Sequence, residues 1–362
     1  MSLRVVVTGA TGNVGIAVMR ALSRHPEVGE AIGLARHPPD AESPAAALPK
    51  VLWASADVVT DDLTAIFRGA DAVVHLAWLI QPSRDHDRLW EVNVGGTARV
   101  LDAVAHAEVP AVVHASSVGA YSPSPPERQQ PMMVDESWPT HGVPTSAYSR
   151  EKAYTERLLD VFEARHDVRV VRLRPSLIFQ AEVASRVRRL FLGSLAPARL
   201  IASGRLPIMP TIRRIRFQVV HADDVADAFV TATVGDARGA FNLAAPPVLS
   251  LDDVARDLEA TAVPVPSIVA RGAVRASWAT RVQPVDVGWY DLALRSPLLD
   301  TTRAHEELGW SPAYSATAAL RELLSSMAAG EGAPTPALEG DEDRSRLREL
   351  RTGQGGSEGA GD

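Results

Sequence analysis

The sequence contains no cysteine, no long apolar run and no excess of positive charge, and each absence excludes a class of protein. Without cysteine, the chain can form no disulfide bond and can use no thiolate in catalysis. No run of 18 uncharged apolar residues occurs, so we expect no membrane-spanning helix. The 362 residues carry a formal net charge of −7, which argues against nucleic acid as the main partner. A predicted strand begins at Arg4, which leaves no room for a signal peptide, and we expect a cytoplasmic protein.

Apolar segments alternate with helical patterns through the first half of the chain. Strands are expected at Arg4–Val7, Ala31–Leu34, Val51–Trp53, Ala72–Leu76, Ala111–Ala115 and Val168–Leu173. Helices are expected at Asn13–Arg24, Asp62–Arg68, Val92–Ala107 and Ser146–His166. The strands are rich in Val, Ile, Leu and Ala, as is typical of strands covered on both faces. This order predicts an α/β fold with a Rossmann-type, doubly wound parallel sheet.

The pattern changes after residue 181. We expect a nucleotide-binding domain with the catalytic residues over 1–181, and mainly a smaller substrate-binding lobe over 182–330. Some strands and helices of the second segment, such as a late strand at Ala240–Leu243, are expected to return to the core. Residues 331–362 are rich in Gly, Pro, Glu and Asp, which predicts a disordered tail.

A glycine-rich loop follows the first strand and opens the first helix. Gly9, Gly12 and Gly15 have the spacing GxxGxxG. A pyrophosphate bound at a helix N-terminus needs close approach of backbone N–H groups, which larger side chains would prevent. The loop therefore predicts a dinucleotide site, to which we also assign Thr11, Asn13 and Val14.

The end of the second strand bears on the choice of cofactor. A carboxylate there would hold the ribose 2′-hydroxyl of NAD, but the segment reads Gly33-Leu34-Ala35-Arg36-His37 and has none. Arg36 is suited to pair with a 2′-phosphate instead. We therefore predict NADP in preference to NAD.

Three polar residues form a candidate catalytic set. Tyr148 and Lys152 are four residues apart on a predicted helix, so they share one face. An ammonium about 4 Å from a phenol contributes on the order of 4 kcal/mol at an effective dielectric of 20. That predicts a fall of about three units in the pKa of Tyr148, to near 7, where acid/base catalysis is efficient. Ser117, at the end of another apolar strand, is placed to hold the reacting oxygen.

Together these motifs resemble the extended short-chain dehydrogenase/reductase superfamily, in its NAD-dependent epimerase/dehydratase branch. The resemblance covers roughly residues 3 to 310 in motif order. It implies that Ser117, Tyr148 and Lys152 form the catalytic triad, with Asn93 as a further active-site residue. It also implies that several other positions contact the cofactor: Asp57, Val58, Leu76, Ala77, Trp78, Asn93, Ser116, Tyr148, Lys152, Pro175 and Ile178. The family further implies a homodimer formed through the two long helices.

Three departures from the family pattern concern the substrate. Nucleotide-sugar epimerases usually carry an asparagine where this chain has Leu177, and an arginine where it has Phe217. A large aromatic residue, Trp78, follows the strand-end motif His75-Leu76-Ala77 and is interpreted either as a more apolar substrate wall or as a core residue. These changes weaken the nucleotide-sugar interpretation.

We therefore expect an NAD(P)-dependent oxidoreductase acting on a small hydroxy or carbonyl compound, with Tyr148 as acid/base. The alternative is a nucleotide-sugar epimerase or dehydratase that retains NAD. A third reading is an NAD(P)-sensing protein without chemistry, although such relatives typically lose the tyrosine or the lysine. His75 and His114 are interpreted as core or cofactor-lining groups, because no second ligand at metal spacing accompanies them. Trp278, Trp289 and Trp310 are interpreted as core residues.

Overall fold

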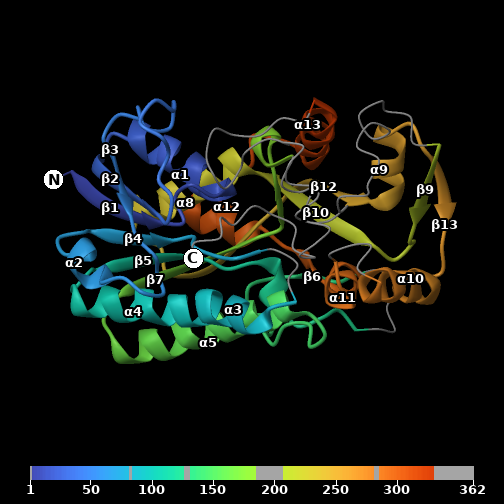
Figure 1. The fold of residues 1–362 in the computed structure, drawn as a ribbon, viewed down its shortest axis with the longest axis horizontal. Helices are drawn as coiled ribbons and strands as arrows, with labels where there is room; N and C mark the ends of the chain where they lie inside the picture. Colours follow the sequence, from blue (N-terminus) through green and yellow to red (C-terminus); the bar gives the residue numbers. More distant parts are fainter. Residues whose placement is uncertain (1, 81–83, 126–130, 185–206, 281–284, 330–362) are drawn as a thin grey trace.

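The structure is a computed structural model, and it describes residues 2–80, 84–125, 131–184, 207–280 and 285–329 (Figure 1). The predicted tail at 331–362 lies outside these residues. Within them, a large central sheet stands between two layers of helices, and smaller sheets lie beyond one end of it (Figure 1).

Seven strands form the central sheet, in the order β11-β7-β5-β4-β1-β2-β3, and every neighbouring pair is parallel. Their bounds are β1 (Leu3–Thr8), β2 (Val28–Ala35), β3 (Val51–Ser55), β4 (Ala72–His75), β5 (Ala111–Ala115), β7 (Arg169–Pro175) and β11 (Gly239–Leu243). The predicted doubly wound fold is confirmed. The late strand, β11, lies at the edge of this sheet beside β7.

Helices cover both faces of the sheet, because its strands carry apolar side chains on both sides. Val5 and Val7 of β1 pack in one core cluster, while Val6 between them packs in the other. The first face is covered by α1 (Asn13–Arg24), α8 (Ala222–Val234) and α12 (Thr302–Leu308). The second is covered by α2 (Leu63–Phe67), α4 (Gly96–His106) and α5 (Ala147–Arg165).

The helix predicted at Val92–Ala107 is part of a longer composite element. It begins with α3 (His86–Trp90), continues through the π-helical segment η1 (Glu91–Gly95) and passes into α4. The π-helical segment carries Asn93, which is fully buried. A widened turn at this place is consistent with a functional site, where such turns are frequent.

Shorter elements surround the carboxyl ends of the central strands. The small sheets contain β6 (Met133–Val134), β8 (Leu177–Phe179), β9 (Ile208–Thr211), β10 (Arg216–His221), β12 (Ala245–Ser250), β13 (Thr261–Pro264) and β14 (Leu298–Leu299). The remaining helices are η2 (Val118–Ala120), η3 (Ala181–Val183), α9 (Leu251–Asp257), α10 (Ser267–Ala279), α11 (Val287–Arg295) and α13 (Ala316–Ala329). The elements α8, β11 and α12 come after residue 181 but belong to the layers of the central sheet. The division into domains at residue 181 stays a prediction.

In the described part of the chain, no helix is both long enough and apolar enough to cross a membrane.

Candidate active site

The glycine loop forms a narrow cradle between β1 and α1. Gly9 has a φ of +72°, and a Cβ there would lie 2.7 Å from the Ala77 Cα. A Cβ on Gly15 would lie 2.3 Å from the Gly9 carbonyl oxygen. Glycine is therefore required at both positions. Gly12 caps α1 without a side-chain hydrogen bond, and the first turn carries no acidic residue, so the helix N-terminus suits an anion such as a pyrophosphate.

The cradle is joined to the segment that follows β7. The Gln180 side chain donates a hydrogen bond of 2.7 Å to the Asn13 Oδ1, and the Asn13 Nδ2 donates one of 3.4 Å to the Ile178 carbonyl oxygen. These bonds bring Asn13 and Ile178 together, as a shared cofactor site requires. The turn after β4, with Leu76 and Ala77, meets the same loop, since the Leu76 N–H donates to the Thr8 carbonyl oxygen at 3.1 Å.

Arg36 and Asp57 lie at the ends of the two neighbouring strands β2 and β3. Arg36 directly follows β2 and is exposed. The Asp57 carboxylate accepts a hydrogen bond of 2.8 Å from the Val59 N–H and so stabilises its own turn, while the Val58 side chain is buried. The structure thus places these predicted adenine-side residues at the same edge of the sheet as the glycine cradle.

Ser117, Tyr148 and Lys152 gather at the carboxyl ends of β5 and β7. The Ser117 Oγ accepts a hydrogen bond from the Gly119 N–H at 3.0 Å and caps η2, and the Ser117 hydroxyl also hydrogen-bonds Tyr148. Tyr148 lies in the first turn of α5, and a Cβ on Gly119 would lie 2.7 Å from its ring. The Lys152 Nζ, one turn later, donates to the Ala115 carbonyl oxygen at 2.7 Å.

The predicted lowering of the tyrosine pKa is wrong for this structure. Burial raises the pKa of Tyr148 to about 12, and the hydrogen bond from Ser117 opposes this only in part. Burial also lowers the pKa of Lys152 to about 7, although Glu156 and Glu151 oppose this shift. The physical reason is that Lys152 is buried and the Tyr148 ring is enclosed by neighbouring side chains. The Lys152 ammonium is directed to the Ala115 carbonyl and to the face of Trp78, 3.4 Å from the ring centroid.

Asn93 is directed toward the turn after β4. Its Oδ1 accepts from the Leu79 N–H at 2.7 Å, and its Nδ2 donates to the Leu79 carbonyl oxygen at 3.0 Å and to the Glu151 carboxylate at 2.7 Å. These bonds fix the backbone just beyond Trp78 and connect it to Glu151 of the catalytic helix. Asn93 therefore shapes the wall of the site through Leu79 and Glu151.

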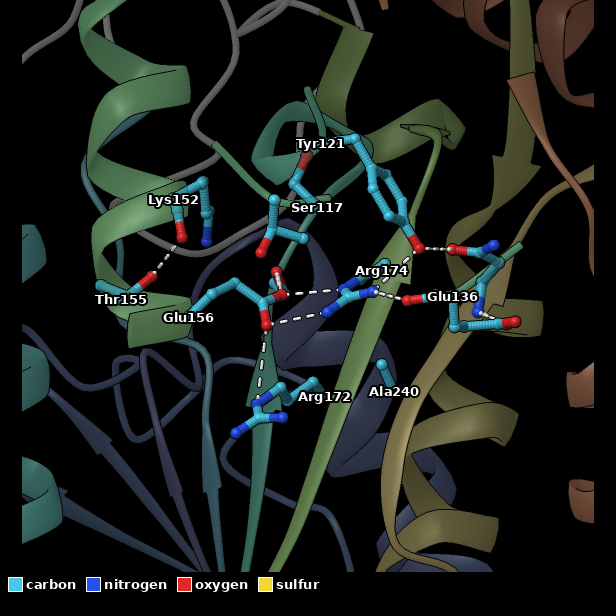
Figure 2. A network of polar contacts seen from close by, with 12 residues as sticks. Ser117, Tyr121, Glu136, Lys152, Thr155, Glu156, Arg172, Arg174 and Ala240 are labelled. Carbon is cyan, nitrogen blue, oxygen red and sulfur yellow. Dashed lines mark hydrogen bonds and ion pairs between the residues drawn. The ribbon is translucent and has the colours of Figure 1, made fainter. Parts of the chain in front are cut away.

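A buried ionic network lies behind Ser117 and Lys152 (Figure 2). Glu156, one turn beyond Lys152 on α5, accepts two hydrogen bonds from Arg174, at 2.8 and 2.9 Å. The same carboxylate accepts a hydrogen bond of 2.6 Å from the Ser116 Oγ, and Arg174 also donates to the Tyr121 hydroxyl at 2.9 Å. Hydrogen bonds from Arg174 and Ser116 hold the pKa of Glu156 below its usual range despite burial. Glu156 therefore stays ionised, paired with Arg174, and opposes the lowering of the Lys152 pKa.

Aromatic side chains pack against Tyr148. Trp78 meets the Tyr148 ring edge-on with centroids 6.0 Å apart, and Trp289 stacks on it at 5.1 Å with an angle of 29°. Tyr148 and Trp289 also line a pocket with Leu79, His86, Leu89, Ala147, Glu151 and Asp286. Trp289 therefore belongs to the site, whereas the sequence analysis interpreted it as core.

Several buried polar atoms in this region have no hydrogen-bond partner among the described residues. They include the Trp78 Nε1, beside Lys152, and the Ser176 Oγ, which directly follows Pro175. Unpaired buried polar groups are costly and rare in native proteins. Together with the glycine cradle, they show that the residues at this edge of the sheet fit a large polar ligand such as a dinucleotide.

The histidines lie in the sheet, as expected. His75 is buried between Thr8 and Thr97, whose hydroxyls lie 2.7 and 3.0 Å from its ring nitrogens, and burial lowers its pKa to about 3. His114 is equally buried on the neighbouring strand. Within the residues that the structure describes, no group of three or more His, Cys, Asp or Glu side chains is arranged to hold a metal ion.

Sequence reasoning missed Glu156 and Trp289. Glu156 carried a signal, since its position four residues after Lys152 places it on the same helix face. Trp289 carried no local signal, because it reaches Tyr148 from α11, far away in the chain. Trp310, by contrast, is buried, as expected of a core residue.

The chain matches a family model and curated proteins over much of its length. The model of the NAD dependent epimerase/dehydratase family matches residues 5–244. UDP-glucose 4-epimerase of Mycolicibacterium smegmatis is 30% identical over 322 residues, which cover 86% of this chain and 94% of that protein. L-arabinose 1-dehydrogenase (NAD(P)(+)) of Haloferax volcanii is 31% identical over 187 residues, which cover 49% of this chain and 68% of that protein.

Solved structures share the fold at lower sequence identity. UDP-glucose 4-epimerase of Thermotoga maritima, crystallised with UDP-glucose, superposes with a TM-score of 0.68 at 19% identity, and the match covers 90% of this chain and 98% of that one. UDP-glucuronic acid 4-epimerase of Bacillus cereus, crystallised with UDP-glucuronic acid and NAD, gives a TM-score of 0.66 at 18% identity over 90% of this chain and 99% of that one.

Proposed function

The chain belongs to the NAD dependent epimerase/dehydratase family, within the extended short-chain dehydrogenase/reductase superfamily, and we propose that it is an oxidoreductase with net turnover of NAD(P). Its substrate is a hydroxy or carbonyl compound, and Tyr148 is the acid/base. The observation that carries the proposal is the convergence of Ser117, Tyr148 and Lys152 beside the glycine cradle.

Each of these residues has one task in the proposed reaction. The bound nicotinamide supplies the hydride in reduction and accepts it in oxidation. Tyr148 donates a proton to the substrate oxygen in reduction and removes it in oxidation. The Ser117 hydroxyl, which already hydrogen-bonds Tyr148, holds that oxygen near the phenol. Lys152 supplies a positive charge that Glu156 and Glu151 help to maintain.

The raised pKa of Tyr148 supports reduction as the favoured direction. With a pKa of about 12, the phenol is protonated at neutral pH and is ready to donate. An alkoxide formed from a carbonyl is a much stronger base than a phenolate, so proton transfer from Tyr148 is downhill. Oxidation of an alcohol would need the phenolate, which is scarce at neutral pH.

We propose NADP as the preferred cofactor, on the basis of Arg36 at the end of β2. An arginine forms charge-assisted hydrogen bonds to a 2′-phosphate, while a carboxylate at this place would repel it. Arg36→Asp should therefore weaken NADPH binding by roughly tenfold or more while NADH binding is retained or improves. Fluorescence titration with both cofactors measures this, and an unchanged NADPH affinity would remove the basis for the preference.

A second candidate is a nucleotide-sugar epimerase that retains NAD. The observation in its favour is the 30% identity with a UDP-glucose 4-epimerase over most of both chains. Against it, the position where such enzymes usually carry asparagine holds Leu177, which is 45% exposed and has no amide to offer a sugar.

Mass spectrometry of the cofactor released from freshly purified, denatured protein separates the two candidates. The proposed oxidoreductase exchanges its cofactor at every turnover, so the protein should release little and then bind added NADPH reversibly. Near-stoichiometric NAD⁺ would favour the epimerase and contradict both net turnover and the NADP preference.

We also propose that the protein is a homodimer that pairs through α4 and α5 and the helical turn before α4. Trp90, Tyr154 and Val161 on this layer are 44%, 45% and 47% exposed, and the rings of Trp90 and Tyr154 lie 4.9 Å apart. Exposed apolar side chains that gather on one face are typical of an interface. Light scattering gives the mass directly, and a monomer at all concentrations would exclude this pairing.

A further inference from the structure

Trp289 lies over the catalytic tyrosine although it comes from a distant part of the chain. Asp286 begins α11 by accepting a hydrogen bond from the Trp289 N–H at 3.1 Å. The side chain then stacks on Tyr148, with ring centroids 5.1 Å apart. The indole therefore lies next to the phenol and lines the same pocket.

The position of Trp289 is built into the fold by a close approach of two helices. Gly288 packs against the start of α5, where a Cβ would lie 2.5 Å from the Thr145 carbonyl oxygen and 2.9 Å from the Ser146 Cα. Only glycine allows α11 to approach so closely. The residue next to Gly288 is therefore held against the first turn of the helix that carries Tyr148.

Further bonds hold α11 in place from its other side. Asp291 makes a bidentate ion pair with Arg271 of α10, at 2.8 and 2.9 Å, and also hydrogen-bonds Thr145. The Tyr290 hydroxyl donates to the Ser267 carbonyl oxygen at 2.9 Å. Trp289 is thus a supported wall of the site and not a loop residue that happens to lie there.

The pocket beside this wall has a definite chemical character. Leu79, Leu89 and Ala147 line it together with Trp289, and its ionisable side chains other than Tyr148 are those of Glu151, Asp286 and His86. Among the described lining residues there is no arginine or lysine. The indole and the aliphatic side chains offer a contact surface to a flat apolar group, and the described lining contains no guanidinium or ammonium to pair with a diphosphate.

On these observations, and on the premise of the proposed function, we propose that Trp289 determines substrate specificity. The enzyme accepts uncharged ketones and secondary alcohols with a flat apolar substituent, an aryl or alicyclic ring, which lies against the Trp289 indole while the oxygen reaches Tyr148 and Ser117. Trp78 closes the other side of the phenol.

Binding tests this proposal independently of turnover. We would measure the affinity of the NADP-loaded protein for acetophenone and for butanone by ligand-observed NMR, in the wild type and in Trp289→Leu and Trp289→Phe. The wild type should bind acetophenone more tightly than butanone. Trp289→Leu should weaken acetophenone binding by about 10- to 50-fold and butanone binding by less than about threefold. Trp289→Phe, which keeps an aromatic face, should retain most of the preference.

Trp278 offers a matched control on the same pair of helices. It contacts Arg84, whose guanidinium lies 4.0 Å from its ring centroid, and it has no described contact with Tyr148. Trp278→Leu should leave the preference unchanged. Equal binding of the two ketones by the wild type, or an unchanged preference in Trp289→Leu, would overturn the specificity proposal.

Turnover of the same ketones with NADPH and NADH tests the proposed function separately. One outcome is that the protein prefers acetophenone in binding but reduces neither ketone, and epimerises UDP-glucose without net change of cofactor. The oxidoreductase proposal then fails. The specificity proposal fails as well, because the ketones would not be substrates. If both ketones are reduced without any preference that depends on Trp289, only the specificity proposal fails.

Discussion

The two sides of the catalytic tyrosine and lysine differ in kind. Behind them, Glu156, Arg174, Ser116 and Tyr121 form a buried network in which each polar group has a partner at hydrogen-bond distance. In front, the Tyr148 ring meets the indoles of Trp78 and Trp289, and the Trp78 Nε1 has no partner among the described residues. The back is ionic, and the front is aromatic and contains a buried donor without a described partner.

We infer that the ionic side of the site mainly stabilises the fold, while the aromatic side mainly determines substrate specificity. A buried ion pair is strongly destabilising to break, because the remaining charge has no water around it. It therefore fixes the ends of β5 and β7 and the catalytic turns of α5 in one arrangement. Aromatic contacts are less directional and can accept different partners, so the front can receive a substrate without disturbing the back.

The largest expected effect is the loss of activity in Tyr148→Phe. This change removes the proton donor but keeps the ring between Trp78 and Trp289. Turnover should fall by about 10³-fold or more, as expected for loss of a general acid. Cofactor affinity and thermal stability should change little, because the hydroxyl contributes one hydrogen bond, to Ser117. Steady-state kinetics and a cofactor titration measure both, and full activity in this variant would exclude Tyr148 as the acid/base.

The second-largest expected effect is a loss of stability when the ionic network behind the site is broken. Glu156→Gln leaves the Arg174 guanidinium buried without its anion, so the free energy of unfolding should fall by about 3–5 kcal/mol. Chemical denaturation measures this loss. Arg256→Gln removes one partner of an ion pair whose arginine side chain is 72% exposed, and serves as the control, with a much smaller effect.

If Glu156→Gln were as stable as the control variant, the network would not hold the site, and the contrast between back and front would be lost. If Glu156→Gln instead lost activity but kept its stability, Glu156 would act only by maintaining the charge of Lys152.

The smallest effect concerns Lys152, which lies between the two sides. Burial lowers its folded pKa to about 7 from 10.5. Between these values the unfolded chain binds more protons than the folded chain, so this group makes the free energy of unfolding rise with pH in that window. Below pH 7 the full cost of burying the ammonium is present. Lys152→Met removes this cost, so its stability advantage over the wild type should be greatest at pH 7 or below and should shrink toward pH 10.

Calorimetry at pH 7 and pH 9 gives the two differences. Lys50→Met, at an exposed position, provides the control. A Lys152→Met difference that stays constant between pH 7 and 9 would show that Lys152 is not buried as a strained cation.

The sequence sufficed for the parts of the molecule that rest on local patterns. The glycine cradle follows from Gly9 and Gly15, whose backbone positions exclude a side chain, and Tyr148 and Lys152 follow from helical spacing. The pKa of Tyr148 could not be predicted in this way, because it depends on burial by Trp78 and Trp289. Trp289 in turn reaches the site only through the approach of α11 to α5 at Gly288, which no local pattern encodes.

The most direct test of the central claim is transfer of deuterium from NADPH deuterated at the transferable position of C4. The protein would be incubated with acetophenone, and the alcohol product examined by mass spectrometry, in the wild type and in Tyr148→Phe. The account predicts one deuterium at the carbinol carbon in the wild type and no product in the variant. Wild-type protein that forms no deuterated alcohol but interconverts a UDP-sugar with retained NAD⁺ would contradict it.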